Sequence, residues 1–148
     1  MMDTALGMIS TVAVGTDGST TADEAVRQAA EIAQRFGAKL VLLSAFQRSP
    51  SAPPAKGDDI ELQWASNPSA RVGSILERAE TRLRQAGIEC ETRTAEGDPG
   101  DVLVRLATEC GADLLVIGNK RMKRRVLGSV PNTVTHRADC SVLVVKTT

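Results

Sequence analysis

The stretch ISTVAVGTDGSTT, residues 9–21, carries an apolar run straight into a turn and the start of a helix. Residues 9–15 are apolar and rich in β-branched side chains, which predicts a buried strand. Residues 16–21 are typical of a turn, and Thr21 with Glu24 three positions later fits a capping box at a helix start. A buried strand that runs directly into a helix is the repeating unit of α/β proteins.

Strand and helix patterns go on alternating to the end of the chain. Apolar runs predict further strands over residues 39–46, 88–95, 113–118 and 141–146, and helical spacing predicts helices over 22–36, 71–87, 99–110 and 130–136. Right-handed crossovers between these strands give an α/β fold, a five-stranded parallel sheet with helices on both faces. The expected strand order is the flavodoxin-like 3-2-1-4-5, within a single domain that spans residues 1–148.

Two segments fall outside this pattern. Residues 1–8 form a possible loose leader, and residues 47–69 hold four prolines and many small polar residues, which indicates a long excursion between elements. Trp64 lies in that excursion and is expected to tether it to the body of the domain. No apolar run approaches the ~20 residues of a membrane span, and no signal peptide is recognisable, so we expect a cytoplasmic protein.

Composition narrows the choice of partners. Lys and Arg total 18 and Asp and Glu total 18, so the formal net charge is zero, whereas a dedicated nucleic-acid or anionic-membrane binder usually carries a basic excess. The aromatic residues are Phe36, Phe46 and Trp64, too few for base-stacking platforms. We therefore expect no nucleic-acid or membrane partner. The cysteines at positions 90, 110 and 140 lack metal-binding spacing, which predicts reduced thiols.

The predicted strand order places a topological switch point between strands 1 and 4, where ligands bind beyond the carboxyl ends of the strands. The first loop at this point is Gly15–Ser19. Its glycines allow a tight turn, and the following helix directs backbone N–H groups at the crevice. In the functional reading, Asp17 accepts a hydrogen bond from a ribose or base, or helps to hold a metal. In the structural reading, it only caps the helix together with Ser19. The segment alone leaves both readings open.

The second loop at the switch point is strongly basic. Gly118 ends a strand, and Gly128 with Ser129 opens a helix. The N–H groups of that helix start, the Ser129 hydroxyl and the nearby cations suit an oligophosphate. The cations are Lys120, Arg121, Lys123, Arg124 and Arg125. A solvated basic loop is the alternative, but the location at the switch point favours anion binding.

Three stretches carry a further signal: VAVGTDGS at 12–19, DLLVIGN at 113–119 and GSVPNTVTHRADCSVLVVK at 128–146. Together they resemble the universal stress protein family, and the likeness runs from the first strand to the last. The resemblance implies an adenine-nucleotide-binding α/β domain that is often a homodimer. ATP-binding members of the family carry the signature Gly-x2-Gly-x9-Gly-Ser/Thr after the fourth strand.

That signature is partly present in this sequence. Gly118 matches its first glycine, and Gly128 with Ser129 matches its closing pair. Arg121 stands at the second glycine, and six residues rather than nine separate it from Gly128. The shorter loop must follow a different path, in which the guanidinium of Arg121 can hold a phosphate in place of bare backbone.

The resemblance also implies positions for the rest of the nucleotide. Gly15, Thr16 and Asp17 would meet adenine and ribose. Ala45, at the end of the second strand, would line the base pocket, although a small residue on a buried strand is also ordinary packing. Val130 would donate its N–H to a phosphate. Charge would come from Lys120, Arg121, Arg124 and Arg125.

Catalytic patterns are missing from the sequence. The phosphate-binding pattern GxxxxGK followed by Ser or Thr, the dinucleotide pattern GxGxxG and the nucleophile pattern GxSxG are all absent, and His136 is the only histidine. No set of nucleophile, base and orienting residue can be assembled. We therefore expect no enzyme activity beyond very slow ATP hydrolysis, and no metal site built by the protein alone.

The leading hypothesis is a stress-response or signalling protein that binds ATP, with or without Mg²⁺, between the loops after strands 1 and 4. One alternative is a member that binds cyclic AMP or AMP, because a shortened loop closes better on one phosphate than on three. Another is a nucleotide-free homodimeric interaction module, which the incomplete signature supports. Under each of these hypotheses we expect a homodimer through the last strand, which would be an exposed sheet edge that pairs with a second copy. It consists of Ser141, Val142, Leu143, Val144 and Val145, followed by Lys146.

Overall fold

The computed structural model describes residues 9–47, 67–119 and 128–146. These residues form five strands and four helices that alternate along the chain. The strands are β1 (Thr11–Gly15), β2 (Lys39–Phe46), β3 (Glu91–Glu96), β4 (Leu114–Asn119) and β5 (Ser141–Lys146). The helices are α1 (Thr20–Phe36), α3 (Pro68–Gln85), α4 (Pro99–Glu109) and α5 (Ser129–Arg137).

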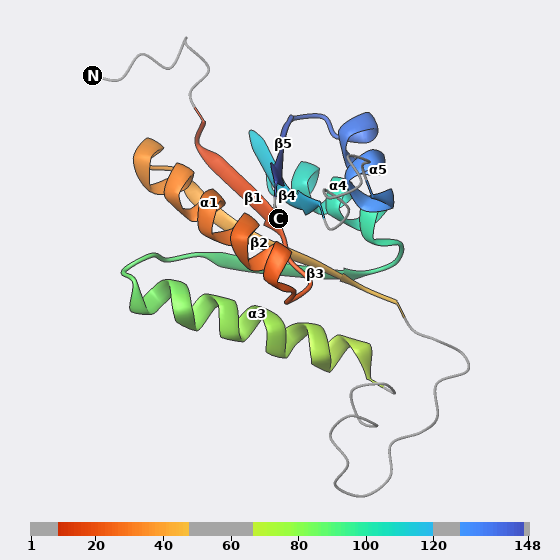
Figure 1. Cartoon of the computed structure of the whole chain (residues 1–148), viewed down its shortest axis with the longest axis horizontal. Helices are drawn as coiled ribbons and strands as arrows, with labels where there is room; N and C mark the ends of the chain where they lie inside the picture. Colours follow the sequence, from red (N-terminus) through yellow and green to blue (C-terminus); the bar gives the residue numbers. More distant parts are fainter. Residues whose placement is uncertain (1–8, 48–66, 120–127, 147–148) are drawn as a thin grey trace, which may run out of the picture.

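The five strands make one parallel sheet in the order β3-β2-β1-β4-β5. This arrangement confirms the predicted α/β class and the flavodoxin-like strand order. Helices α1 and α3 cover one face of the sheet, and α4 and α5 cover the other (Figure 1). Because β1 lies in the middle with β2 and β4 on its two sides, the chain reverses its direction of winding there.

Both faces of the central strands are buried. Val12 and Val14 of β1 pack with the small side chains of α1, whereas Ala13 between them packs with α4 and α5. All three are fully buried, as expected of a parallel strand whose successive side chains point to opposite covered faces. This double burial explains why β1 is an unbroken apolar run in the sequence.

Helix α1 begins differently from the capping-box prediction. Its N-cap is Ser19, whose Oγ accepts from the N–H of Ala22 at 3.1 Å. The helix therefore includes Thr20 and Thr21, and Thr21 is already inside the first turn. The sequence offers hydroxyls at all three positions, and the turn that follows β1 brings Ser19 to the helix start first.

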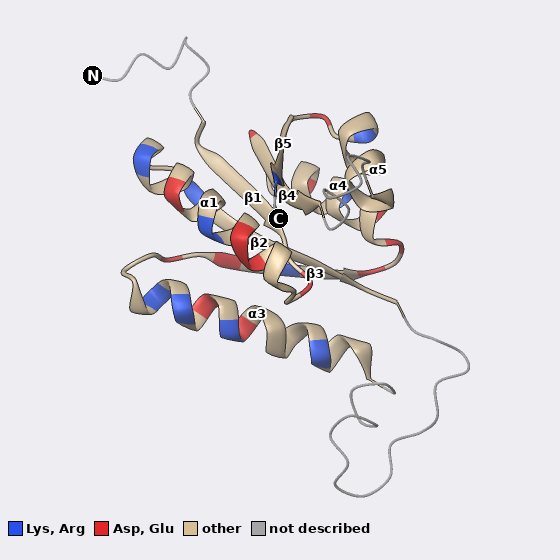
Figure 2. Ribbon diagram, viewed as in Figure 1, with Lys and Arg blue, Asp and Glu red and all other residues tan. Residues whose placement is uncertain are grey.

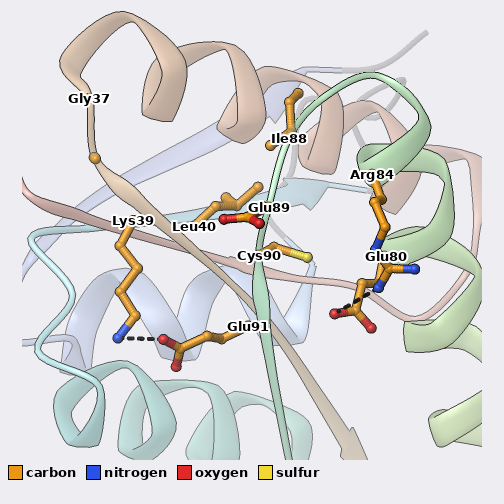
Figure 3. Close-up of a pocket in the computed structure, with 10 residues that line it drawn as sticks. Gly37, Lys39, Leu40, Glu80, Arg84, Ile88, Glu89, Cys90 and Glu91 are labelled. Carbon is orange, nitrogen blue, oxygen red and sulfur yellow. Dashed lines mark ion pairs between the residues drawn. The ribbon is translucent and has the colours of Figure 1, made fainter.

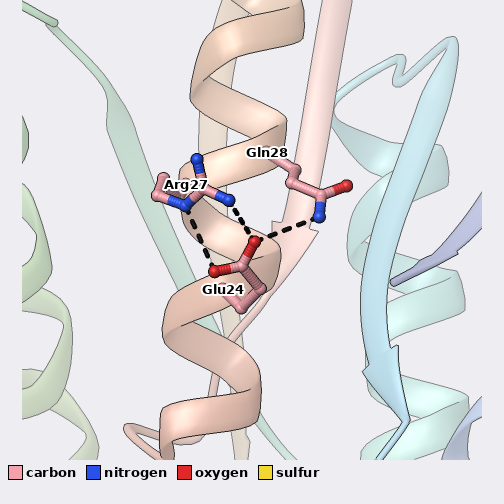
Figure 4. A network of polar contacts seen from close by, with 3 residues as sticks. All are labelled: Glu24, Arg27 and Gln28. Atoms are coloured by element: carbon pink, nitrogen blue, oxygen red, sulfur yellow. Dashed lines mark hydrogen bonds and ion pairs between the residues drawn. The ribbon is translucent and has the colours of Figure 1, made fainter. Parts of the chain in front are cut away.

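Glu24, the other half of the predicted box, bonds along the helix instead. Its carboxylate accepts from Nε of Arg27 at 3.1 Å and from the amide of Gln28 at 3.1 Å (Figure 4). The Arg27 guanidinium, followed by the Gln28 amide, lowers the pKa of the Glu24 carboxyl. This group is on the surface, so it contributes little to the free energy of unfolding.

The remaining element starts follow local chemistry. Asp98 caps α4, and the helix begins at Pro99, the residue at which it was predicted to begin. Helix α3 begins at Pro68 rather than at residue 71, because Asn67 provides an earlier cap. Strand β3 begins at Glu91 rather than at residue 88. The N–H of Ile88 bonds back to the carbonyl of Leu83 at 2.8 Å and so still closes the end of α3.

Asp113 ties the amino ends of β1 and β4 together. Its Oδ2 accepts from the N–H groups of Ser10 at 2.9 Å and Thr11 at 3.0 Å, and from the Ser10 hydroxyl at 3.3 Å. The Ser10 N–H bond is the main cause that lowers the pKa of the Asp113 carboxyl. The central strand pair is thus anchored at the end opposite to the switch point.

The surface of the described residues is mixed in charge. Basic and acidic residues are interspersed along α1 and α3 (Figure 2). Helices that cross a membrane are absent from the described part of the chain, since none is both long and apolar enough.

Cys90, Cys110 and Cys140 are free and half-buried, and burial is the largest cause that raises the pKa of each thiol.

Candidate functional site

A cavity of about 370 Å³ lies beyond the carboxyl ends of β1, β2 and β4, where the strand order reverses. Its walls come from the loop after β1, the ends of β2 and β4, and the starts of α4 and α5. Eight of the residues predicted for the site border this cavity: Gly15, Thr16, Asp17, Ala45, Gly118, Gly128, Ser129 and Val130. The other four, Lys120, Arg121, Arg124 and Arg125, lie outside the described residues.

The loop after β1 is held by bonds to β2 and within itself. The N–H of Thr16 donates to the carbonyl of Leu43 at 2.9 Å, and the hydroxyl of Ser44 donates to the carbonyl of Thr16 at 2.7 Å. The Thr16 Oγ1 accepts from the N–H of Gly18 at 3.2 Å. Thr16 and Ser44 are 6% and 2% exposed, so these bonds are protected from water and fix the cavity wall.

The structure gives Asp17 and Ser19 different roles. Ser19 caps α1 through the N–H of Ala22. Asp17 does not cap the helix; its Oδ1 accepts from the N–H of Ser19 at 2.9 Å and stabilises the turn. Both residues also border the cavity. The helix-cap reading is therefore correct for Ser19, while the exposed Asp17 carboxylate stands beside the cavity.

Gly118 allows the close approach of α1 to the end of β4. A Cβ atom at this position would lie 2.6 Å from Cγ2 and 2.9 Å from the backbone oxygen of Thr21. The backbone contact cannot be relieved by turning a side chain. Gly118 therefore lets the first turn of α1 lie directly over the strand end that borders the cavity.

Asn119 joins the end of β4 to the start of α5. Its side chain is buried, with 1% of the residue exposed, and its Oδ1 accepts from the N–H of Gly128 at 3.1 Å. Gly128 is the N-cap residue of α5, and its N–H is thus engaged by the protein itself. This bond changes the expectation for the anion site, in which Gly128, Ser129 and Val130 were all to donate to phosphate.

Helix α5 presents the two remaining donors. It has no side-chain cap and no acidic residue in its first turn, and its third residue, Pro131, has no N–H. Within the described part of the chain, the N–H groups of Ser129 and Val130 have no protein partner. Both residues border the cavity, so α5 offers two donors and the positive end of its dipole to an anion.

Sequence reasoning missed two polar residues of this site, Ser44 and Asn119. Each is nearly fully buried at the end of an apolar strand. That position is the signal that could have found them, because a buried polar side chain must be bonded. Leu103 and Ile117 form the apolar floor of the cavity.

Larger openings exist elsewhere on the described surface. A depression of about 610 Å³ lies at the amino ends of β2 and β3 (Figure 3). Four of its five charged side chains form ion pairs with one another: Lys39 with Glu91 at 2.7 Å and Arg84 with Glu80 at 3.5 Å. The cavity at the carboxyl ends, which the first residues of α5 border, lies where ligands bind in open α/β sheets.

Carboxylates are scarce around the cavity. Asp17 is the one acidic side chain that borders it among the described residues. Within those same residues, no cluster of three or more His, Cys, Asp and Glu side chains could hold a metal ion. A metal bound here would need most of its ligands from the bound molecule or from water, as Mg²⁺ on nucleotide phosphates does.

Comparison with known proteins agrees with this architecture. Residues 8–146 match the model of the universal stress protein family. Universal stress protein Rv1636 of Mycobacterium tuberculosis is 42% identical over 144 residues, which cover 93% of this chain and 97% of that protein.

Solved structures of similar proteins include nucleotide complexes. A universal stress protein in complex with cAMP is 38% identical, with a TM-score of 0.73 over 95% of this chain and 99% of the other. A family protein from Arabidopsis thaliana with AMP bound is 25% identical, with a TM-score of 0.74 over 94% of this chain and 92% of the other. The match of sequence and fold over nearly the whole chain establishes that this protein belongs to the universal stress protein family.

Proposed function

We propose that this protein binds an adenine nucleotide in the cavity beyond β1, β2 and β4. The observation that carries the proposal is the cavity itself, which lies at the switch point and is bordered by Ser129 and Val130, the first two residues of α5. The cAMP and AMP complexes of similar proteins support adenine as the base.

The phosphate lies at the start of α5 in this proposal. Two backbone N–H groups and the helix dipole favour a negative charge there. The Ser129 hydroxyl adds a third donor. Lys120, Arg121, Arg124 and Arg125 supply countercharge from the sequence between Asn119 and Gly128. Gly128 contributes by placing the helix start, since its own N–H bonds to Asn119.

Adenine and ribose lie toward β1 and β2. Gly15 and Thr16 form the wall, the Asp17 carboxylate accepts from ribose hydroxyls, and Ala45 leaves room for the ring beside the end of β2. The apolar floor at Leu103 and Ile117 suits the face of a base.

ATP is the ligand that we propose first, with Mg²⁺ held by its phosphates and Asp17. Five cations in six positions match a triphosphate better than a monophosphate. Cyclic AMP or AMP is the second candidate. It is favoured by the short spacing before Gly128 and by the cAMP bound to the 38% identical structure.

The action that we propose is binding, in a stress-response or signalling role, without catalysis beyond very slow ATP hydrolysis. The residues around the cavity include no histidine, and Asp17 is the one carboxylate among those described. We also propose that residues 1–148 form one domain that works in the cytoplasm as a homodimer through β5. Strand β5 is an edge of the sheet, and Val142, Leu143 and Val144 are only half-buried.

The test is calorimetric titration of nucleotide-stripped protein with ATP, ATP plus Mg²⁺, cyclic AMP and AMP, with GTP as the control. Tight binding of ATP supports the first ligand, and preference for cyclic AMP or AMP supports the second. If no adenine nucleotide binds at millimolar concentration, the protein is a nucleotide-free interaction module and the proposal is wrong.

The phosphate assignment has its own test in Arg124→Ala/Arg125→Ala. Loss of two cations weakens a ligand in proportion to its charge, so we expect affinity for ATP to fall at least about tenfold while affinity for adenosine stays the same. The matched control is Arg78→Ala/Arg84→Ala on α3, away from the cavity. Equal losses for ATP and adenosine would contradict the assignment.

A further inference from the structure

Two of the three cysteines share one apolar layer of the fold. Cys110 is the C-cap residue of α4, and Cys140 directly precedes β5. Both pack against the layer that α4 and α5 form with the sheet, whereas Cys90 packs against the layer on the opposite face. All three thiols are free and only partly buried. The protein therefore has two thiols on one face of the sheet and a third on the other, which serves as an internal reference.

The amino ends of β4 and β5 place Cys110 and Cys140 at the same corner of the sheet. Leu114 of β4 pairs with Ser141 of β5, so the residues before them, Asp113 and Cys140, enter the sheet side by side. Neighbouring strands lie about 4.8 Å apart. Two residues separate Cys110 from Asp113, so the end of α4 is tied to this corner as well.

A side-chain contact holds α4 against the chain that enters β5. Oγ1 of Thr108, in the last turn of α4, lies within hydrogen-bond distance of Oδ2 of Asp139, at 3.3 Å. Cys110 follows Thr108 by two residues, and Cys140 follows Asp139 by one. Burial raises the pKa of the Cys140 thiol, and the nearby Cys110 thiol is the next largest cause. Cys110 and Cys140 are therefore neighbours in the folded chain.

The charges around the two thiols differ. Burial raises the pKa of both. At Cys110 the positive charge of Arg93 on β3 opposes this rise, and the charge of Lys39 on β2 acts in the same direction as Arg93. At Cys140 the neighbouring acidic groups add to the rise; they are Cys110, Asp113 and Asp139. Because a thiolate and not a thiol attacks an oxidant, these charges favour Cys110 as the first of the pair to react.

We propose that Cys110 and Cys140 form a peroxide-responsive pair that closes an intramolecular disulfide. The Cys110 thiolate attacks the terminal oxygen of a hydroperoxide, ROOH, and the O–O bond breaks. Cys110 becomes a sulfenic acid, and RO⁻ leaves as ROH with the proton that the thiol released. The Cys140 thiolate then attacks the sulfenic sulfur and displaces hydroxide, which leaves as water. In total, two thiols and one hydroperoxide give one disulfide, one ROH and one water.

The bridge would join the end of α4 to the start of β5. The covalent loop would enclose β4 and α5, which supply Gly118 and Ser129 to the cavity. The inference does not depend on nucleotide binding, because neither cysteine borders the cavity. In a reducing compartment, a disulfide of this kind is transient and acts as a redox sensor.

The first test uses the full chain, reduced and then treated with hydrogen peroxide. Alkylation identifies the thiols that remain, and intact mass with a peptide map identifies the product. We expect only the Cys90 thiol to remain free, the mass to fall by that of two hydrogen atoms, and the peptides of Cys110 and Cys140 to be joined within one chain. Retention of all three thiols, oxygen added without a link, a link to Cys90 or a link between two chains would each overturn the proposal.

Variants then separate the roles of the two thiols. Cys90→Ser is the matched control and should form the bridge as the parent does, whereas Cys110→Ser and Cys140→Ser should form none. In Cys140→Ser the sulfenic acid at Cys110 has no thiol to meet, so dimedone should label it, and Cys110→Ser should give much less label at Cys140. Stronger labelling of Cys140 than of Cys110 would overturn the assigned order. Circular dichroism establishes that each variant is folded, and if a serine variant does not fold, the peptide map of the parent decides.

Discussion

Gly118 is the position in the site at which an added side chain would disturb the structure most. Gly118→Ala places a methyl group 2.9 Å from the backbone oxygen of Thr21, so the start of α1 must move. We expect a loss of about 1–3 kcal/mol in the free energy of unfolding and a weaker nucleotide affinity, measured by urea unfolding and calorimetry.

Gly73→Ala is the control for this change. Gly73 lies within α3, and a Cβ there would meet no atom within 4 Å. Alanine is a better helix former than glycine, so this variant should be as stable as the parent or up to about 1 kcal/mol more stable. A Gly118→Ala protein that behaves like Gly73→Ala would show that α1 and β4 do not approach so closely.

Asp113 gives the protein a defined acid sensitivity. Hydrogen bonds from Ser10 and Thr11 lower the pKa of its carboxyl in the folded state. The stability that this group contributes is therefore present above its unfolded pKa of about 3.9 and is lost as the pH falls through the lower folded value. Asp113→Asn should be less stable than the parent at pH 7, and the two proteins should converge toward pH 2.

Urea unfolding at pH 7, 4 and 2 measures this convergence. Glu77→Gln, an exposed change on α3, is the control and should follow the parent at every pH. A constant difference between Asp113→Asn and the parent would mean that the charge of Asp113 is not involved.

Several features at this scale could not be predicted from the sequence. Ser44 and Asn119 find their partners 28 and nine residues away, and no local pattern reports such pairs. The N-cap of α1 was assigned to Thr21 because Glu24 follows it at the right spacing, whereas the turn geometry selects Ser19. Gly15, Thr16 and Asp17 could be predicted to lie beside the cavity, because glycine and turn residues after a buried strand are a local signal.

Helices α4 and α5 depend on each other for their positions. Gly100, in the first turn of α4, is buried, and a Cβ there would lie 2.8 Å from Cβ of Thr133 on α5. Gly100→Ala should push the helices apart and cost about 1–3 kcal/mol. Since α5 carries the Ser129 and Val130 donors, nucleotide affinity should fall as well. Urea unfolding and calorimetry measure the two effects, and Gly73→Ala again serves as the control.

An unchanged affinity in Gly100→Ala would show that α5 is positioned by β4 and β5 rather than by α4. If Gly100→Ala is as stable as Gly73→Ala, the space between Gly100 and Thr133 is wide enough for a methyl group.

Element bounds were predictable where polar residues end an apolar run on both sides. Residues 39–46 and 141–146 were predicted as strands and are β2 and β5 with the same ends. Strand β3 was placed too early because Ile88 is apolar, although its N–H serves the end of α3. The periodicity of apolar residues cannot show that a backbone N–H is already bonded to the preceding helix.

The two edges of the sheet differ in how well they could pair with another strand. Strand β3 carries charged and polar residues, whereas β5 is apolar over Val142–Val145. Charged edges resist pairing and apolar edges favour it. We expect the protein to sediment at twice its 15.7 kDa chain mass, and Val144→Lys to sediment as a folded monomer.

Analytical ultracentrifugation with circular dichroism measures mass and folding together. Thr94→Lys, on the exposed β3 edge, is the matched control and should stay dimeric. A monomeric parent protein, or dissociation by Thr94→Lys alone, would contradict an interface at β5.

The bond between Asn119 and Gly128 has a consequence for how this protein can be altered. It fastens the residue before the basic segment to the residue after it, so a bond between two residues of the described scaffold holds these two ends together. The stretch between these two residues can then be exchanged as a cassette. Segments of other lengths and charges, including the longer spacing of the family signature, can be inserted between Asn119 and Gly128 without redesign of the sheet or of α5.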